Sequence, residues 1–445
     1  MPQQEVAQPK SILRGHSTQV HVTTFIRRNE RLASGDADGF VVLWDLTIMR
    51  PRAVWHAHTG AILGISGWGD DKVVTEGRDN RLIVWKIAAE DEAKLSIDLP
   101  LDESAPERPQ PWILYILEIN TMNFCSFAQC SPRQDVDLAV SDESLVAVPN
   151  TLATEAVDIF HLPSQSRLST VHLGSKAEKK GMVMTLSLFW RGESLILLAG
   201  YENGLAIVAR RRHGGAWDIL YKHQAHSQPI LSLDFSPDKE YFLTSGADAI
   251  IAKHPIPDTN SSTPPVPGFK RTEESETTRD SNASTSGSKT QPRGVPKNDS
   301  AAEPLKIINT KHSGQQGLQI RSDGRIFATA GWDSKVRIYS AKTMTELAVL
   351  KWHDVGCYAA AFSVLDVGQK HVFENSQDKP GKSEPEEQTT DLNNTIVTGN
   401  KETAMTAASR PGELSVKDRR IKMAKEAHWL AAGSKDGKIS LWDIY

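Results

Sequence analysis

The chain has 445 residues, which is enough for two or three ordinary domains or for one large ring of β-sheets. Its 51 Lys and Arg residues nearly balance 55 Asp and Glu residues, and the net charge of −4 argues against a general attraction to nucleic acid or to an anionic membrane. The chain has no apolar run of about 18 residues, which excludes the membrane-spanning class. Its three cysteines, an odd number at no metal-ligand spacing, exclude the disulfide-rich secreted class.

A repeated pattern of two short strands joined by a tight turn runs along the chain. Each copy has an apolar strand, a turn built on Gly, Asp or Asn, and an alternating strand that ends in an aromatic residue. This is hairpin chemistry, because the turn needs residues that tolerate positive φ. The clearest copies are LASGDADGFVVLWDL (32–46), VVTEGRDNRLIVWKI (73–87), FATAGWDSKVRIYS (327–340) and LAAGSKDGKISLWDI (430–444).

Polar residues stand at fixed distances from the closing aromatic residue of each copy. An Asp lies six residues before it, a Ser or Thr lies ten residues before it in all but the last copy, and a His precedes the hairpin. This series resembles the WD-repeat β-propeller, whose blades contain a buried hydrogen-bonded chain of these side chains. Such a chain stabilises a blade only when every member has a partner. The residues predicted to form it are His16, Ser34, Asp38, Trp44, His58, Thr75, Asp79, Trp85, His312, Thr329, Asp333, Asp436 and Trp442.

Counting the repeats in chain order predicts an all-β, seven-bladed WD40-type β-propeller that fills residues 1–445 as one domain. The third blade is degenerate, and Ala432 lacks the hydroxyl group of the buried chain, which predicts a weaker chain in blade seven. Because the sequence stops after the third strand of blade seven, Lys10–Arg14 is expected to supply its outer strand. The N- and C-terminal strands would then close the ring and leave no long free sheet edge.

Three insertions separate strands of the predicted propeller. Residues 88–110 form an inserted loop, residues 257–303 a disordered insertion in blade five, and residues 364–426 a largely disordered insertion in blade seven. All three leave from the same end of their blades. The opposite end, the short-loop face, carries the tight connections, and we expect Asp36 and Arg78 to be exposed there and to contact partners. A basic run at 417–422 suggests either a nuclear-import patch or a charged helix.

Catalysis and metal binding are the less favoured interpretations of the polar residues. His16, Ser34 and Asp38 have the side chains of a nucleophilic triad, but an active site would not recur around a ring. His56, His58, His223 and His226 lack an accompanying Cys or carboxylate cluster. We therefore expect no enzyme, no cofactor and no metal.

Several stretches resemble one fungal family, ASTRA-associated protein 1, whose animal relatives are G-protein β-subunit-like WD proteins. Two of them, ILYILEINTMNFCSF and VPNTLATEAVDIFHLP, fall around the degenerate third blade and are not dictated by generic propeller rules. The matching stretches are 34–46, 54–65, 77–87, 113–127, 148–163, 330–340 and 428–445.

The resemblance implies a non-catalytic scaffold subunit of a nuclear multiprotein assembly, the ASTRA complex. That complex is linked to chromatin remodelling and to maturation of phosphatidylinositol-kinase-related kinases. The implied partners are AAA+ ATPase co-chaperones and kinase-related subunits, without direct contact to nucleic acid or membrane. The implied location is the nucleus, with the cytoplasm as a second one. The alternative is a substrate receptor of a ubiquitin ligase or another WD-repeat peptide-binding adaptor.

Overall fold

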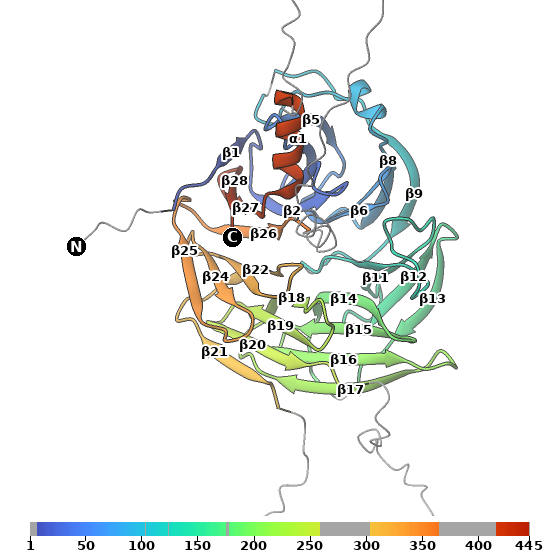
Figure 1. Ribbon diagram of the computed structural model, residues 1–445. Coiled ribbons are helices and arrows are strands. Elements are labelled where there is room, and N and C mark those ends of the chain that lie inside the picture. The colour runs from blue at the N-terminus through green and yellow to red at the C-terminus, as the bar shows by residue number, and fades with distance from the viewer. Residues whose placement is uncertain are drawn as a thin grey trace, which may run out of the picture.

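The computed structural model describes residues 7–102, 104–122, 124–174, 178–258, 303–364 and 415–444. These residues form seven antiparallel sheets, each of four strands, arranged around a central axis (Figure 1). The predicted seven-bladed β-propeller is therefore confirmed.

Blades one to four follow one another along the chain. Blade one contains β2 (Val20–Ile26), β3 (Arg31–Asp36), β4 (Phe40–Asp45) and β5 (Arg50–His56). Blade two contains β6 (Ile62–Trp68), β7 (Lys72–Gly77), β8 (Arg81–Lys86) and β9 (Trp112–Glu118). Blade three contains β10 (Ala128–Cys130), β11 (Ser144–Pro149), β12 (Val157–Leu162) and β13 (Ser166–Val171). Blade four contains β14 (Val183–Arg191), β15 (Ser194–Tyr201), β16 (Leu205–Arg211) and β17 (Trp217–Gln224).

The remaining three blades include the one that joins the chain ends. Blade five contains β18 (Ile230–Phe235), β19 (Tyr241–Gly246), β20 (Ile250–Pro255) and β21 (Lys306–Asn309). Blade six contains β22 (Gln315–Ile320), β23 (Ile326–Gly331), β24 (Val336–Ser340) and β25 (Glu346–Leu350). Blade seven contains β26 (Cys357–Phe362), β27 (Trp429–Ser434), β28 (Lys438–Asp443) and β1 (Ser11–Arg14).

The core lies between neighbouring blades, so the second and third strands have side chains buried on both of their faces and are almost continuously buried. Glycines in the second strands allow the next blade to approach closely. A Cβ at Gly35 would meet Ile62 of blade two at 2.6 Å, and one at Gly433 would meet Val20 of blade one at 2.7 Å. Blades one and two thus each begin with a β-branched side chain that packs against the backbone of the preceding blade.

The ring closes where β1 pairs with β28, shown in blue and red in Figure 1. The strands are antiparallel, with Ser11 opposite Leu441 and Arg14 opposite Lys438. The predicted closure by the segment from Lys10 to Arg14 is confirmed.

The insertions occupy the predicted connections. Residues 88–110 lie between β8 and β9 and contain the 3-10 helix η1 (Asp91–Lys94). Most of the predicted insertion at 257–303 and of the one at 364–426 lies outside the described residues, at 259–302 and 365–414. The end of the last one forms α1 (Val416–Glu426), which Ser415 caps by accepting a hydrogen bond from the Asp418 N–H. The basic run at 417–422 therefore lies within a helix.

Removal of residues 1–15 is expected to open the ring, because it strips blade seven of its outer strand and exposes the edge of β28. We expect loss of a single cooperative thermal transition and concentration-dependent aggregation, measured by calorimetry and light scattering. Removal of residues 1–8, which leaves β1 in place, serves as the control. A soluble and cooperatively folded 1–15 deletion would contradict this account of closure.

Candidate functional site

The buried polar chain of blade one joins four side chains, but its carboxylate is Asp36 and not the predicted Asp38. His16 Nδ1 lies 2.7 Å from Asp36 Oδ2, and His16 Nε2 lies 2.7 Å from Ser34 Oγ. The Trp44 indole N–H donates to Ser34 Oγ at 2.8 Å. Because a carboxylate only accepts, His16 Nδ1 carries the imidazole proton and donates it to Asp36. His16 Nε2 then accepts from the Ser34 hydroxyl group, which in turn accepts from the Trp44 indole N–H.

The prediction for Asp38 was wrong because of one position in the turn. Blade two has Gly77 where blade one has Asp36, and a Cβ at Gly77 would lie 2.3 Å from the ring of His58. Without a side chain there, the histidine of blade two reaches the Asp at the tip of the turn. In blade one the Asp36 side chain takes that place, and Asp38 is exposed.

Blade two contains the predicted chain. His58 Nδ1 lies 2.9 Å from Asp79 Oδ1 and His58 Nε2 2.8 Å from Thr75 Oγ1, which also accepts from Trp85 Nε1 at 2.8 Å. Although burial alone would raise the pKa of Asp79, its hydrogen bond with His58 and the charge of that ring lower it.

Blade five contains a buried polar chain whose members are not among the predicted residues. His226 bridges Asp248 at 2.9 Å and Thr244 at 2.8 Å, and Thr244 Oγ1 lies 2.9 Å from His254 Nε2. The Tyr221 hydroxyl extends the chain, 2.9 Å from His254 Nδ1. Burial lowers the pKa of His254 well below its usual value, which keeps the ring neutral. The sequence contains the same spacing: Asp248 lies six residues and Thr244 ten residues before His254, which stands where the other blades have the closing aromatic residue.

In blade six the predicted role of His312 was wrong. Thr329 Oγ1 donates to Gln315 Oε1 at 2.6 Å, so a glutamine takes the place of the imidazole. His312 is exposed, with its Nδ1 3.5 Å from Asp333, and Asp333 accepts from Arg337 Nη1 at 3.0 Å. The connection from β21 to β22 has positive φ at Lys311 and Gly314, and this backbone path directs the His312 side chain toward solvent.

In blade seven, Ala432 has no hydroxyl group for the buried chain, and a serine of the neighbouring strand supplies one instead. Ser440, opposite Ala432 in the β27–β28 register, lies 2.8 Å from His353 Nε2 and accepts from Trp442 Nε1 at 2.9 Å. The predicted Asp436 binds Lys438 Nζ at 2.6 Å instead of joining this chain. His353 Nδ1 has no hydrogen-bond partner among the described residues.

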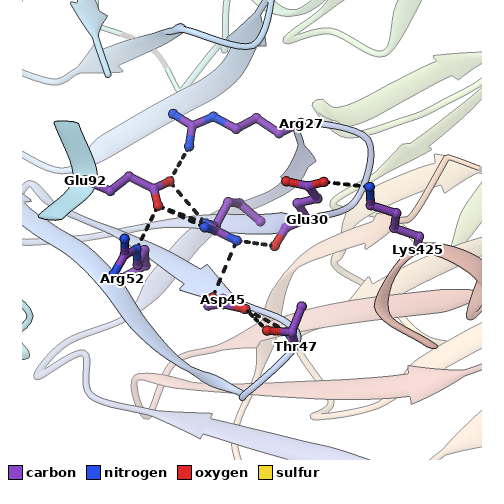
Figure 2. A network of polar contacts seen from close by, with 8 residues as sticks. Arg27, Glu30, Asp45, Thr47, Arg52, Glu92 and Lys425 are labelled. Carbon is purple, nitrogen blue, oxygen red and sulfur yellow. Dashed lines mark hydrogen bonds and ion pairs between the residues drawn. The ribbon is translucent and has the colours of Figure 1, made fainter. Parts of the chain in front are cut away.

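On the face of the ring that carries the long connections, a buried carboxylate holds the 88–110 insertion in place (Figure 2). Glu92 of η1 is fully buried and is bound by Arg27, Arg31 and Arg52 of blade one. Its Oε2 lies 2.9 Å from Arg31 Nη2 and 3.0 Å from Arg52 Nε. Burial alone would raise the pKa of Glu92, but the hydrogen bonds and charges of the arginines lower it, so the carboxylate stays ionised.

The same insertion continues across blade one toward the closure of the ring. The Ser96 carbonyl accepts from Val54 N at 2.8 Å, and the Leu101 N–H donates to the Gly15 carbonyl at 2.8 Å. Helix α1 lies on this side as well, with Lys425 Nζ 2.7 Å from Glu30 in the β2–β3 turn (Figure 2). The long connections therefore cover this face of blade one.

The short-loop face differs from expectation at one of its two predicted contact residues. Asp36 is fully buried in the blade-one chain, so its predicted exposure was wrong, whereas Arg78 is exposed. At the ring centre a cavity of about 300 Å³ is walled by the first residues of the inner strands, which follow directly on the short loops. Phe124 lines this cavity and remains half exposed.

A second buried carboxyl group joins blades two and three. Glu76 on β7 is fully buried and accepts the Phe127 N–H at 2.6 Å, while its Oε1 has no partner among the described residues. Burial raises its pKa to about 8, against the smaller opposite effect of the Phe127 N–H. Near neutral pH this group is therefore mainly protonated.

No cluster of three or more His, Cys, Asp or Glu side chains suited to a metal ion occurs in the described part of the chain. No helix among those residues is long and apolar enough to cross a membrane.

Asp36→Asn should lower the free energy of unfolding by about 2 kcal/mol, because its amide would face a donor where both carboxylate oxygens now accept. Asp38→Asn, at the exposed tip of the same turn, should change it by less than about 0.5 kcal/mol. Urea unfolding measures both. Equal effects of the two substitutions would show that the assignment of Asp36 is wrong.

Glu76→Gln should stabilise the protein increasingly as the pH rises. The pKa of Glu76 is about 8 in the folded state, against 4.5 for an ordinary Glu. Between these values unfolding releases a proton, so the parent loses up to about 1.4 kcal/mol of stability per pH unit, and the glutamine variant does not. Urea titrations across this range, with exposed Glu118→Gln as the control, should show a gap that widens with pH. A constant gap would contradict the raised pKa.

The chain matches the family model described as ASTRA-associated protein 1 over residues 9–442. It is 48% identical to ASTRA-associated protein 1 of Pyricularia oryzae, over 99% of this chain and 97% of that protein. It is 49% identical to the Verticillium alfalfae protein of the same name, over 99% and 94%. It is 32% identical to the Schizosaccharomyces pombe protein of the same name, over 80% of this chain and 94% of that protein. The chain belongs to the ASTRA-associated protein 1 family.

Proposed function

We propose that this protein is a non-catalytic scaffold subunit of the ASTRA assembly, acting in the nucleus. The name of its relatives supports the association, and the rigid ring, which presents many loops on one frame, supports the scaffold role. We further propose roles in chromatin remodelling and in maturation of phosphatidylinositol-kinase-related kinases. The proposed partners are AAA+ ATPase co-chaperones and kinase-related subunits.

The use of the Ser, His and Asp side chains supports a role without catalysis. The Ser34 hydroxyl lies between His16 and Trp44 and is fully buried, so it is engaged on both sides and closed to a substrate. Blades two and five use Thr75 and Thr244 in the same way. A group repeated in this manner holds strands together.

The observation that carries the proposal is the contrast between the two faces of the ring. The 88–110 insertion and α1 cover blade one on one side. The short-loop face presents exposed Phe124, which lines the central cavity, and exposed Trp332, whose indole N–H donates to Gln316 of the cavity wall. Exposed aromatic side chains on a rigid frame are typical of protein interfaces, and we therefore propose the short-loop face as the main partner surface.

Affinity purification of the tagged full-length chain from its native cells tests this function. Kinase-related and AAA+ proteins are expected to co-purify. Trp332→Ala should reduce their recovery severalfold, whereas Ile48→Ala, at an exposed turn of the opposite face, should not. Thermal melting confirms that both variants are folded. Cullin adaptors in place of these proteins would favour a ubiquitin-ligase receptor, pre-ribosomal proteins would favour an RNA-processing factor, and either result would overturn the proposal.

A further inference from the structure

Two loops of the short-loop face present large apolar side chains to solvent. The connection from β9 to β10 exposes Met122 by 75% and Phe124 by 55%, and the connection from β11 to β12 exposes Leu152 by 96%. Both loops come from the stretches around blade three that generic propeller rules do not dictate. Exposed apolar groups gathered on one face indicate an interaction site more often than a structural need.

Buried polar side chains fix these two loops to each other and to blade two. Asn120 Nδ2 donates to the Asn150 carbonyl at 2.8 Å, and the Thr121 hydroxyl donates to Asn80 Oδ1 at 2.8 Å. Asn150 Oδ1 in turn accepts the Leu152 N–H at 2.9 Å. Asn120, Thr121 and Asn150 are all buried. The backbone amides of Met122 and Leu152 are therefore held by buried asparagines, which lowers the entropy that these two residues lose on docking.

A cation borders these apolar side chains. The Arg78 guanidinium lies over the ring of Phe124, 4.6 Å from its centroid. Among the described residues no carboxylate forms an ion pair with Arg78, so its N–H groups remain available to an acceptor from outside. A guanidinium presents paired donors that match a carboxylate.

We propose that Arg78, Met122, Phe124 and Leu152, here called the blade-three patch, bind a linear segment of a partner protein that carries an Asp or Glu beside large apolar side chains. The apolar groups cover Met122, Phe124 and Leu152, and the carboxylate pairs with Arg78. This inference rests on the proposed function, because it names the surface through which the subunit joins its assembly.

Site-specific photo-crosslinking identifies the segment. A benzoylphenylalanine replaces Phe124 in one full-length chain and Leu347 in a control chain; Leu347 is 58% exposed on the outer strand of blade six. Irradiation of the co-purified assembly should link position 124 to a partner peptide that contains an acidic residue next to apolar ones, and position 347 should not link to that peptide. A link from position 124 only to this chain itself, or no link, would overturn the proposal.

A synthetic peptide with the cross-linked sequence then tests the chemistry against the purified full-length chain. Arg78→Glu should weaken binding at least tenfold, and a peptide with Lys in place of its acidic residue should recover binding to that variant. Phe124→Ala combined with Leu152→Ser should weaken binding similarly, whereas Leu347→Ser should not. Melting temperatures verify folding of every variant.

Failure of the blade-three patch and failure of the proposed function give different experimental results. An assembly that forms normally while the peptide ignores all blade-three variants would overturn the patch and leave the proposed function standing. A chain that co-purifies with no ASTRA-type partner would overturn both.

Discussion

The ring depends on one non-covalent joint. Six of the seven blades are continuous in sequence, but blade seven borrows β1 from the other end of the chain. The joint consists of backbone pairing between Ser11–Arg14 and Lys438–Asp443. Without it, blade seven loses its outer strand, and the central cavity and the short loops lose a fixed geometry. Every property that requires a rigid frame therefore depends on a joint of four residue pairs.

The long connections reinforce this joint from outside. Leu101 donates to the Gly15 carbonyl directly after β1, and the Leu99 side chain packs so closely that a Cβ at Gly15 would lie 2.6 Å from it. Glu92 anchors the other end of the same segment under three arginines of blade one. A buried carboxylate is stable there only because its charge is compensated, and loss of one partner would leave a charge unpaired. The insertion thus acts as a strap across blades two, one and seven.

Local signals in the sequence were sufficient for the architecture and insufficient for some contacts. Hairpin turns and strand alternation are read over a few residues, so the seven blades and the role of β1 could be predicted. Asp36 was missed because the offset rule ignored the side chain that replaces a glycine in the turn. His312 was misplaced because the path of its loop depends on backbone conformation. Glu92 gave no signal, since its arginine partners lie 40 to 65 residues away in an unrepeated contact.

Native-state hydrogen exchange of the full-length chain tests the central claim, that the ring is one closed cooperative unit, most directly. The amides of β1 and β28 at the joint are compared with those of the inner strands β14 and β18, which lie far from it. If closure is integral to the fold, the joint should exchange with nearly the same opening free energy as these inner strands. Exchange at the joint with a much lower opening free energy, while the inner strands stay fully protected, would contradict the account.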